Sequence, residues 1–556
     1  MADRDEFSAP FDPSVDWGRW SSVAVGRVSS EWMDAIRSDP LLRRARVVGA
    51  LVFGGERRAL ASTEIIRSTS RDGRRVEASP DLEDEPELEE SIDIGNPGPR
   101  SRSISATVPG RLVRAGDMLA AGRQLEAHGE VSLLIDGMTW EHRLVFLRGP
   151  TVGGMIVGRD DEPVELTISD PQIHTRLIPP WLLDTTRFDE LPASASGKRI
   201  PLIVGYARGV PCPRVASSVG GGDDDFLVGY GSLSVSAQWI QGATTASGTV
   251  VVTEDDRGLP VTLLRYTAGA SDDFATINAT AKETGSAIAR SVVRSIERIL
   301  TLHGLIDSTR ISDRLFSEAR VREPDTGLGT GARTSPRICV NEPTRALDYV
   351  TDDLLGDYPW CSMVWDGAGL GPVVIDHRAE PVARLEVGQY PIAERVEGGG
   401  YELGGADDLV TSVIVRYDYD PVTDTYEGVE TRDQETSTIC ATASRISGGD
   451  NPSEDLDGLT IGDQPTAAFT ADWIVEHRSR PYLDVMVLAY PVAWIMLRLG
   501  DPVRWTDDDE EIVLDDEEAI LIGRAWRGGM VELTVRVFPR AWGDIGGGSR
   551  AYPSRY

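Results

Sequence analysis

Glycine-rich segments are the first places in this sequence where nucleotide chemistry could reside. A phosphate-binding P-loop has the pattern G-x-x-x-x-G-K-[ST], in which backbone N–H groups and the lysine bind phosphate groups. The only Gly-Lys pair, Gly197-Lys198, is followed by Arg199 and lacks the first glycine. The segments 327–331 and 367–371 lack the flanking strand and helix of a dinucleotide-binding loop. The sequence therefore predicts flexible loops here and no cofactor.

Histidines and serines show no catalytic or zinc-binding pattern. A zinc protease needs the spacing H-E-x-x-H, and a hydrolase nucleophile elbow needs G-x-S-x-G. Neither pattern occurs in the chain. His303 stands beside Gly304 and is interpreted as a residue that caps carbonyl groups at a helix end. The six histidines are His128, His142, His174, His303, His377 and His477.

Carboxylates are abundant, with 89 Asp and Glu residues, so counting alone does not exclude a glycosidase pair. Nothing in their spacing singles two of them out. The acidic runs 507–511 and 515–518 flank an apolar segment and could bind calcium, but they lack the glycine of an EF-hand loop. We interpret them as a solvated hairpin tip and leave calcium binding open. The sequence thus predicts no catalytic, cofactor-binding or metal-binding residue, and a protein that is not an enzyme.

The net charge of −33 bears on possible partners. A groove that grips DNA needs clustered Lys and Arg to displace counterions, so we expect no tight nucleic-acid binding. A negative wall would still let DNA pass without holding it. Only Lys198 and Lys282 are lysines, and the excess of arginine fits either a GC-rich genome or a saline habitat.

The four cysteines, Cys212, Cys339, Cys361 and Cys440, lie far apart and form no C-x-x-C pair. We expect buried free thiols, although distant pairs could meet in space and oxidise. No apolar run approaches the ~20 residues that span a membrane, and the N-terminus lacks the layout of a signal peptide. The sequence therefore predicts no membrane span and synthesis in a cytoplasm.

A chain of 556 residues exceeds what one hydrophobic core usually supports, so several domains are expected. The predicted fold class is mainly β with α+β insertions, including two tube-like antiparallel barrels or sandwiches. The predicted parts are an N-terminal arm that docks on a neighbouring subunit (1–43), a first β domain (44–190), a small β domain (195–280), an α+β domain (281–395), a second β-barrel domain with one helix (396–545) and a C-terminal tail (546–556).

Local patterns support these parts. Val164, Leu166 and Ile168 alternate with polar residues, as in a strand with one buried face, and Asp136-Gly137 predicts a tight hairpin between 130–135 and 139–146. The acidic connector 81–90 is interpreted as a solvated loop. The helices and later hairpins are predicted at 288–300 with Thr284 or Ser286 as N-cap and Gly304 at its end, at 344–355, at 466–478, at 361–365 with 371–376, and at 519–526 with 530–538.

The order of elements, together with short motifs at 409–417, 466–475 and 499–507, resembles the hub proteins at the tail end of long-tailed bacteriophages. Similar proteins occur in related injection machines and gene transfer agents. The closing hairpin, 522–526 with 531–535, belongs to the same pattern, and 200–205 and 129–140 resemble stretches of the same phage proteins.

The resemblance implies a homotrimer with two tube-like β-barrels per subunit, which matches a sixfold tail tube on one side and a threefold tip on the other. It implies a place in the virion tail after assembly in the host cytoplasm, with DNA passing through the ring. The implied partners are other copies of the chain, the tail tube or distal tail protein, the tape-measure protein, and tail tip or fibre proteins. Two alternatives stay open: another baseplate or distal-tail ring protein, and a secreted carbohydrate-binding or carbohydrate-cleaving β protein.

Overall fold

The computed structural model is mainly β, with 47% strand and 20% helix, which confirms the predicted fold class. Three of its sheets are curled into half-barrels. The structure describes residues 19–540 apart from 54–55, 63–64, 83–85, 95–97, 110–127, 153–162, 172, 174, 217–222, 241–242, 246–247, 267–275, 285–289, 326–333, 368, 397–400, 405–408, 449–451 and 509–512.

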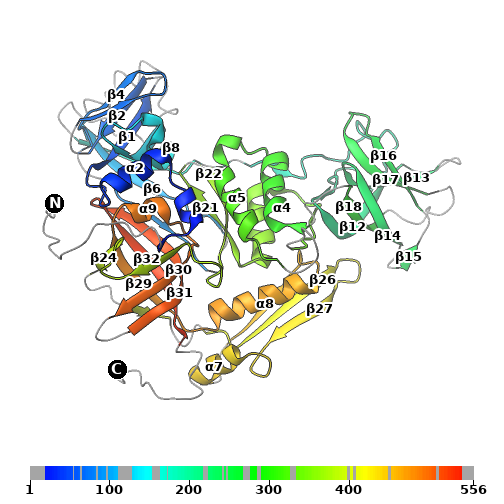
Figure 1. Ribbon diagram of the computed structural model, residues 1–556. Helices are drawn as coiled ribbons and strands as arrows, with labels where there is room; N and C mark the ends of the chain where they lie inside the picture. The colour runs from blue at the N-terminus through cyan, green and yellow to red at the C-terminus, as the bar shows by residue number, and fades with distance from the viewer. Residues whose placement is uncertain are drawn as a thin grey trace. The chain divides into compact units, whose positions relative to one another are not determined.

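The chain forms two compact units, each made of more than one segment (Figure 1). Unit 1 comprises Met1–Gln172, Ser362–Asp408 and Arg480–Tyr556. Unit 2 comprises Ile173–Cys361 and Leu409–Ser479. Each of the two segments of unit 2 is therefore an insertion into unit 1.

The first sheet of unit 1 has six strands in the order β2-β1-β7-β8-β9-β6. Its strands are β1 (Ala45–Phe53), β2 (Glu56–Ala61), β6 (Ser103–Pro109), β7 (His128–Ile135), β8 (Leu144–Val152) and β9 (Pro163–Ser169). A separate hairpin pairs β3 (Ile66–Thr69) with β4 (Arg75–Ala78). The predicted alternation along β9 is confirmed, since Val164, Leu166 and Ile168 are buried.

The hairpin predicted around Asp136-Gly137 is present, but its return strand starts later than expected. Gly137 has a φ of 85°, which suits the turn. The chain then makes a 3₁₀ turn, η4 (Trp140–His142), before β8 begins at Leu144. Trp140 is buried there, so its ring fills the core from a turn rather than from the predicted strand.

The C-terminal sheet of unit 1 has eight strands, in the order β23-β30-β31-β32-β29-β24, with β25 beside β29 and β5 beside β31. They are β5 (Leu88–Ser91), β23 (Ala383–Glu386), β24 (Ile392–Arg395), β25 (Tyr401–Leu403), β29 (Leu483–Ala489), β30 (Pro502–Asp508), β31 (Val513–Arg527) and β32 (Met530–Phe538). The hairpin of β21 (Cys361–Asp366) and β22 (Gly369–Val374) precedes β23 in the sequence and matches its predicted position.

The interpretation of 81–90 as a solvated loop is wrong for its last residues. Leu88–Ser91 forms β5, which pairs with β31 across more than four hundred residues of sequence. Leu88 and Glu90 are both buried because they share one face of this strand.

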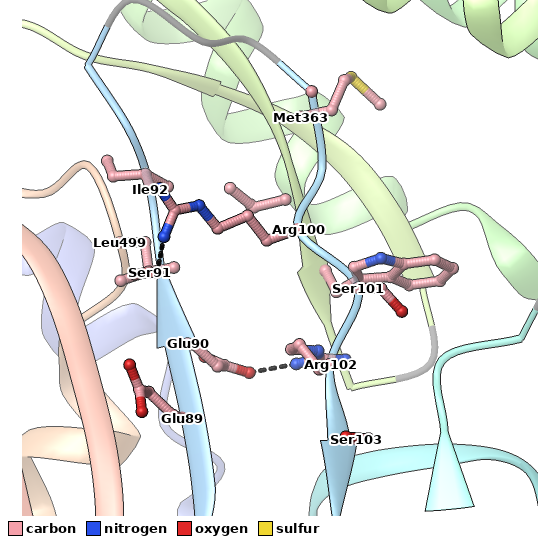
Figure 2. A pocket seen from close by; sticks show the side chains of 13 residues that line it. Glu89, Glu90, Ser91, Ile92, Arg100, Ser101, Arg102, Ser103, Met363 and Leu499 are labelled. Carbon is pink, nitrogen blue, oxygen red and sulfur yellow. Dashed lines mark hydrogen bonds and ion pairs between the residues drawn. The ribbon is translucent and has the colours of Figure 1, made fainter. Parts of the chain in front are cut away.

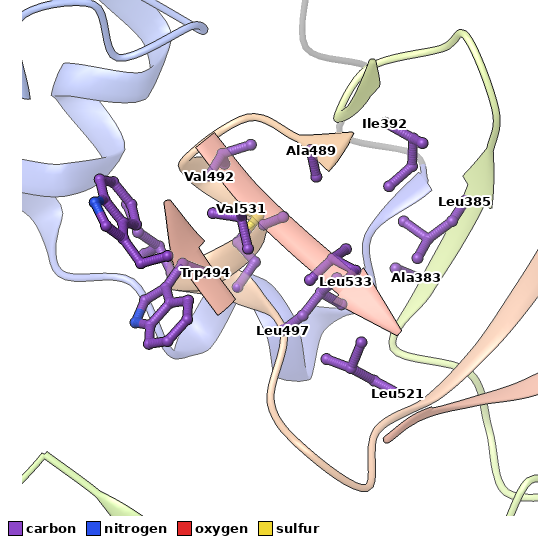
Figure 3. Packing of buried hydrophobic residues seen from close by; sticks show 14 of the residues in the cluster. Ala383, Leu385, Ile392, Ala489, Val492, Trp494, Leu497, Leu521, Val531 and Leu533 are labelled. Atoms are coloured by element: carbon purple, nitrogen blue, oxygen red, sulfur yellow. The ribbon is translucent and has the colours of Figure 1, made fainter. Parts of the chain in front are cut away.

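One hydrophobic core joins the two sheets of unit 1. It contains Val131 and Leu133 from the first sheet and Val485 and Leu533 from the C-terminal sheet. Figure 3 shows the C-terminal part of this core, where Trp494 of α9 (Val492–Met496) lies near Val531. Both curved sheets therefore belong to one folded unit.

The N-terminal segment packs on this same core. Its helices are α1 (Ser22–Gly26), with Ser21 as N-cap, and α2 (Ser30–Ser38), with Ser29 as N-cap. Trp20, Trp32 and Ile36 are buried in the core of unit 1. The surface that these apolar residues need is thus supplied by their own chain.

Unit 2 contains a seven-stranded antiparallel sheet in the order β15-β14-β18-β12-β13-β17-β16. Its strands are β12 (Tyr206–Ala216), β13 (Asp224–Tyr230), β14 (Leu233–Ile240), β15 (Ala243–Thr245), β16 (Thr249–Glu254), β17 (Pro260–Tyr266) and β18 (Thr276–Glu283). Phe226 and Tyr266 meet edge to face in its core, with ring centroids 5.5 Å apart. Two short pairs, β10 (Leu177–Ile178) with β20 (Thr344–Arg345) and β11 (Leu202–Ile203) with β19 (Cys339–Val340), complete the strands of this region.

The first helix of unit 2 begins later than the sequence predicts. Ser291, and neither Thr284 nor Ser286, caps the first helix, because its hydroxyl accepts a hydrogen bond from the Arg294 N–H. Ser286 and Ile288 lie outside the described residues. The helical segments are α4 (Val292–Arg298), η6 (Ile299–His303), η7 (Ser308–Arg310), α5 (Asp313–Arg322), α6 (Ala346–Asp348), η8 (Tyr349–Leu354) and η9 (Leu355–Asp357).

A three-stranded sheet with two helices forms the other part of unit 2. β26 (Ser412–Asp420) is central, antiparallel to β27 (Thr425–Arg432) and parallel to β28 (Ser453–Asp457). The helices are α7 (Thr438–Ile446) and α8 (Gln464–Arg478), the second of which matches the predicted helix. In the described part of the chain no helix combines the length and the apolar character needed to cross a membrane.

Candidate functional site

The histidines do not converge on a metal site. In the described part of the chain, no three His, Cys, Asp or Glu side chains are grouped to hold a metal ion. His174 lies outside the described residues. Burial, aided by the charge of Arg298, lowers the pKa of His303 to about 4, so its imidazole is neutral at pH 7. His303 therefore brings no positive charge to the helix end at which the sequence predicts it as a cap of carbonyl groups.

The cysteines are free thiols, as expected, and Cys212, Cys361 and Cys440 are buried, while Cys339 is half-buried. Burial raises the pKa of Cys339 to about 12. The thiol at this position is therefore protonated at neutral pH and a poor nucleophile.

The predicted acidic hairpin tip is only partly what the sequence suggested. Residues 509–512 lie outside the described residues. Asp507 is buried rather than solvated, because Arg395 forms an ion pair with it and the Tyr401 hydroxyl donates to its Oδ2 over 2.8 Å. Its carboxylate is thus committed to structural contacts within unit 1.

Among the described residues, a group of four buried charged side chains lies in unit 1, where its two sheets meet. It consists of Glu90 on β5, Arg102 just before β6, Asp170 just after β9 and Arg524 on β31. We call these four residues the buried charge network. Each is less than a tenth exposed, with Glu90 at 4% and Arg524 at 8%.

Arg102 is the centre of the buried charge network. Its guanidinium forms an ion pair with Glu90 and a second with Asp170, where Nη2 lies 2.9 Å from Oδ1. Nη2 also donates to the Gly367 carbonyl over 2.7 Å. The Arg102 backbone N–H donates to Asp170 Oδ2 over 2.8 Å, so the carboxylate fixes both the main chain and the side chain.

Arg524 holds the other oxygen of Glu90. Its Nε donates to Glu90 Oε2 over 2.6 Å, and its Nη1 donates to the Leu497 and Trp494 carbonyls over 2.8 and 3.1 Å. The guanidinium stacks on the Trp494 ring with its carbon 4.1 Å from the centroid, a favourable cation–π geometry. Glu90 therefore links Arg102, which lies just before β6 of the first sheet, to Arg524, which lies on β31 of the C-terminal sheet.

Burial and the ion pairs act in opposite directions on the pKa values of this network. Burial raises the pKa of Asp170, although the hydrogen bonds and the charge of Arg102 lower it. Burial alone would lower the pKa of Arg102, but the charges of Glu90 and Asp170 raise it above its ordinary value. Two arginines face two carboxylates, so the formal charges cancel, and the pair of Arg102 with Asp170 is bidentate. Such an arrangement holds structure and leaves no free proton donor or nucleophile for catalysis.

A cavity of about 270 Å³ opens beside the Glu90–Arg102 pair. Figure 2 shows Arg100 and Ser91 on its wall, where Arg100 Nη1 donates to Ser91 Oγ over 2.9 Å. Trp365 and Met363 of β21 supply apolar wall. Arg100 is bonded to Ser91 and Arg102 to Glu90 at this wall, and these side chains alone assign no ligand to the cavity.

A second buried carboxylate stabilises the first sheet. Glu130 on β7 accepts hydrogen bonds from Arg143, from Arg148 Nε over 2.7 Å and from Ser132 Oγ over 2.8 Å. Burial would raise the pKa of Glu130, but the hydrogen bonds and charges of Arg143 and Arg148 lower it to about 2.

We expect Glu130→Gln to lower the free energy of unfolding of unit 1 at pH 7 by about 3 kcal/mol. The folded pKa lies below the unfolded one, so this stability is present above pH ~4.5 and is lost as the pH falls toward 2. Chemical unfolding at several pH values measures it. The difference from the parent protein should shrink below pH ~4.5, and Glu165→Gln, on an exposed position of β9, should have little effect at any pH.

Comparison with solved structures finds tail proteins at low identity. The chain is similar to the tail protein from Neisseria meningitidis, with 10% identity, a TM-score of 0.36, and coverage of 89% of this chain and 98% of that chain. For the prophage MuSo2 43 kDa tail protein from Shewanella oneidensis, the identity is 10%, the TM-score 0.26 and the coverage 62% and 100%. For the Francisella PdpA-VgrG complex, these values are 8%, 0.32, and 95% and 57%.

No family model and no curated protein matches the chain. The structural likeness is thus one to tail and baseplate proteins at low sequence identity.

Proposed function

We propose that this protein is a structural component of a phage tail, the hub at the distal end, and not an enzyme. The observation that carries the proposal is the construction of unit 1, in which two curled sheets share one hydrophobic core. This agrees with the two tube-like domains that the sequence resemblance implies. Three copies of unit 1 present six curved sheets, which fits a sixfold tube on one side and a threefold tip on the other.

The buried charge network supports a load-carrying role. A hub has to keep its two curved sheets in a fixed relation while DNA passes, and hydrophobic packing alone tolerates sliding more readily than directional bonds do. Bidentate arginine pairs fix the geometry of the groups they join. In unit 1 they connect the strand ends of the first sheet, through Arg102 and Asp170, to β31 of the C-terminal sheet.

The net charge of the protein is compatible with a channel through which DNA passes without being bound. With a net charge of −33, a ring of this protein offers DNA few sites for counterion release, so DNA is not gripped. The partners of such a hub are the tail tube or distal tail protein, the tape-measure protein and the tip or fibre proteins.

The hub proposal is tested by the symmetry and the copy number of the assembled protein. We expect the protein in tail particles to show threefold symmetry, and the purified protein to have the mass of three copies or a multiple of three by light scattering. A closed threefold ring, in which each copy contacts the next through the same pair of surfaces, has three copies.

Six copies in strict sixfold symmetry within the particle, or a monomer in the particle, would contradict the hub proposal. A sixfold ring would favour a distal-tail ring protein instead. Reproducible cleavage of peptidoglycan or polysaccharide, lost on changing one carboxylate, would favour the carbohydrate-active alternative.

A further inference from the structure

The cavity of about 270 Å³ in unit 1 lies between the edges of two sheets. One wall is β5, which lies beside β31 and contributes Glu89, Glu90 and Ser91. The opposite wall is the start of β6, the edge strand of the first sheet, with Arg102 and Ser103. Figure 2 shows these two walls with the Glu90–Arg102 ion pair between them. We call this space the edge cavity.

The backbone of β5 turns half of its hydrogen-bonding groups toward the edge cavity. In an antiparallel pair, residues that bond to the neighbouring strand alternate with residues that do not. The Ile92 N–H donates to the Ile522 carbonyl over 2.8 Å, so Glu90, two residues earlier, also bonds to β31. Glu89 and Ser91 have the other parity. Their N–H and C=O groups therefore point away from β31.

The backbone of β6 has the same property on the opposite wall. The Asp170 N–H donates to the Arg102 carbonyl over 3.0 Å, so Ser103 turns its N–H and C=O away from β9. Pro109 opposes Pro163 in this ladder, which agrees with the alternation because two prolines exchange no hydrogen bonds. Among the described residues, neither β5 nor β6 pairs with a second strand. Two sheet edges with free main-chain groups therefore face one cavity.

An apolar wall and a buried ion pair complete the edge cavity. Met363 and Trp365 of β21 line it, together with Leu499. Glu90 and Arg102 are both buried, so their ion pair closes the space between the strands on the side of the core. The cavity volume lies just below the ~300–1,000 Å³ of ligand pockets, and it suits a few residues of extended chain.

The rim of the edge cavity favours a cationic guest. Glu87, Glu89 and Asp93 have side chains that are 68%, 73% and 51% exposed. Arg527 lies 4.0 Å from Glu87 and 3.8 Å from Glu89, too far for hydrogen bonds. Arg100 pairs with Asp93, but its side chain is 56% exposed, so this pair contributes little and a guest can replace it. The net charge of −33 adds to the attraction.

We propose that the edge cavity binds an extended segment of another polypeptide, which adds as a strand between β5 and β6. An extended backbone presents donors and acceptors on both of its edges, as the two walls require, whereas a small ligand would leave most of these groups unused. Strands lie ~4.8 Å apart, so one guest strand separates the walls by roughly 10 Å. The guest alternates apolar residues, which face Met363 and Trp365, with lysine or arginine, which face the rim.

This inference goes beyond the hub proposal and does not depend on it. All residues of the edge cavity belong to unit 1, so a single copy of the chain contains the whole site. Binding is measured on the purified protein whatever its copy number. Failure of peptide binding therefore leaves the symmetry test of the hub untouched, and the reverse also holds.

The first test uses a synthetic peptide of three lysines that alternate with two valines, blocked at both ends. We expect one peptide to bind per purified full chain in calorimetry at low ionic strength. A scrambled peptide of equal charge, with adjacent valines, should bind about tenfold more weakly because it cannot direct both valines to the apolar wall. Equal binding of the two peptides would show general attraction to an acidic protein and overturns the proposal.

N-methylation of the same peptide tests the two walls separately. Methylation at the central lysine removes the donor to one wall, and methylation at the valine before it removes the donor to the other. Each change should weaken binding by about fivefold, because a main-chain acceptor loses its partner. No loss with either peptide overturns the site, and a loss with only one of them overturns the position between two strands.

The variant Ser103→Pro locates the site on the protein. It removes an N–H that faces the edge cavity and none that bonds to β9, so peptide binding should weaken by about fivefold. The matched control is Thr107→Pro, on the same strand and the same open edge but away from the cavity. Unchanged binding to Ser103→Pro, or an equal loss with Thr107→Pro, overturns the assignment. If Ser103→Pro does not fold, the methylated peptides decide the question on the parent protein.

Discussion

Arg102→Met should lower the free energy of unfolding of unit 1 by about 3–5 kcal/mol. The substitution keeps an unbranched apolar stem, in a shorter side chain, and removes the charge that faces Glu90 and Asp170. Asp170 then loses its bidentate partner inside unit 1, and Glu90 keeps only Arg524. An unpaired buried carboxylate costs far more than the pair itself contributes relative to apolar residues. Denaturant unfolding followed by tryptophan fluorescence measures the loss.

The matched control is Arg384→Met on the same unit. Arg384 lies 3.0 Å from Asp516, but its side chain is 64% exposed, so the pair contributes at most about 1 kcal/mol. A double variant, Arg102→Met with Asp170→Leu, should recover part of the lost stability, because it removes an uncompensated charge. An Arg102→Met protein as stable as the control would show that the buried charge network does not hold the sheets together.

Unit 2 should become less stable as the pH rises from about 4 to about 7, by up to about 4 kcal/mol from one residue, Asp357. Burial raises the pKa of Asp357 to about 7, although the hydrogen bonds from Thr460 lower it; the charges of Asp353 and Asp457 add smaller upward effects. Thr460 donates to Oδ2 from its N–H over 2.7 Å and from Oγ1 over 2.6 Å. The folded state therefore binds a proton that the unfolded state has released.

The pH dependence of stability that Asp357 causes has the opposite sign to that caused by Glu130. A raised carboxyl pKa in the folded state contributes stability at low pH, which is lost as the pH rises through the window between the two pKa values. Asp357→Asn keeps an oxygen that accepts from Thr460, and should make unit 2 more stable above pH 7. Asp352→Asn, on an exposed position of η8, is the control and should leave the pH profile unchanged. A profile for Asp357→Asn identical to that of the control would place the folded pKa near its ordinary value.

Elements with clear periodicity could be predicted from the sequence. The alternation along β9, the hairpin of β31 and β32, and α8 after its N-cap Asp463 each depend on neighbours within a few residues. The sequence predicts a start for the first helix of unit 2 that lies too near the N-terminus. Several serines and threonines there could act as N-cap, and only tertiary contacts decide which one does. Here Glu323 favours Ser291 as the N-cap, because its carboxylate accepts hydrogen bonds from the Ser291 hydroxyl and from the Val292 N–H.

The buried charge network could not be predicted in the same way. Glu90 lies in an acidic run, which normally indicates a solvated loop, and its partner Arg524 is 434 residues away. One local signal was present: Leu88 and Glu90 share the buried face of a strand pattern. That signal marks Glu90 as buried but does not identify the arginines, which only the pairing of β5 with β31 brings close.

The segmented construction of the two units sets an order of events during translation. Unit 2 ends at Ser479, and the last segment of unit 1 begins at Arg480. A ribosome thus releases all of unit 2 before β29 to β32, which supply Val485 and Leu533 to the core of unit 1. Val131 and Leu133 are synthesised several hundred residues earlier than these partners. Until the partners are synthesised, they expose apolar surface to chaperones and to other nascent chains. Synthesis that stops before Arg480 therefore yields a chain in which the inserted unit can fold while the surrounding one cannot close.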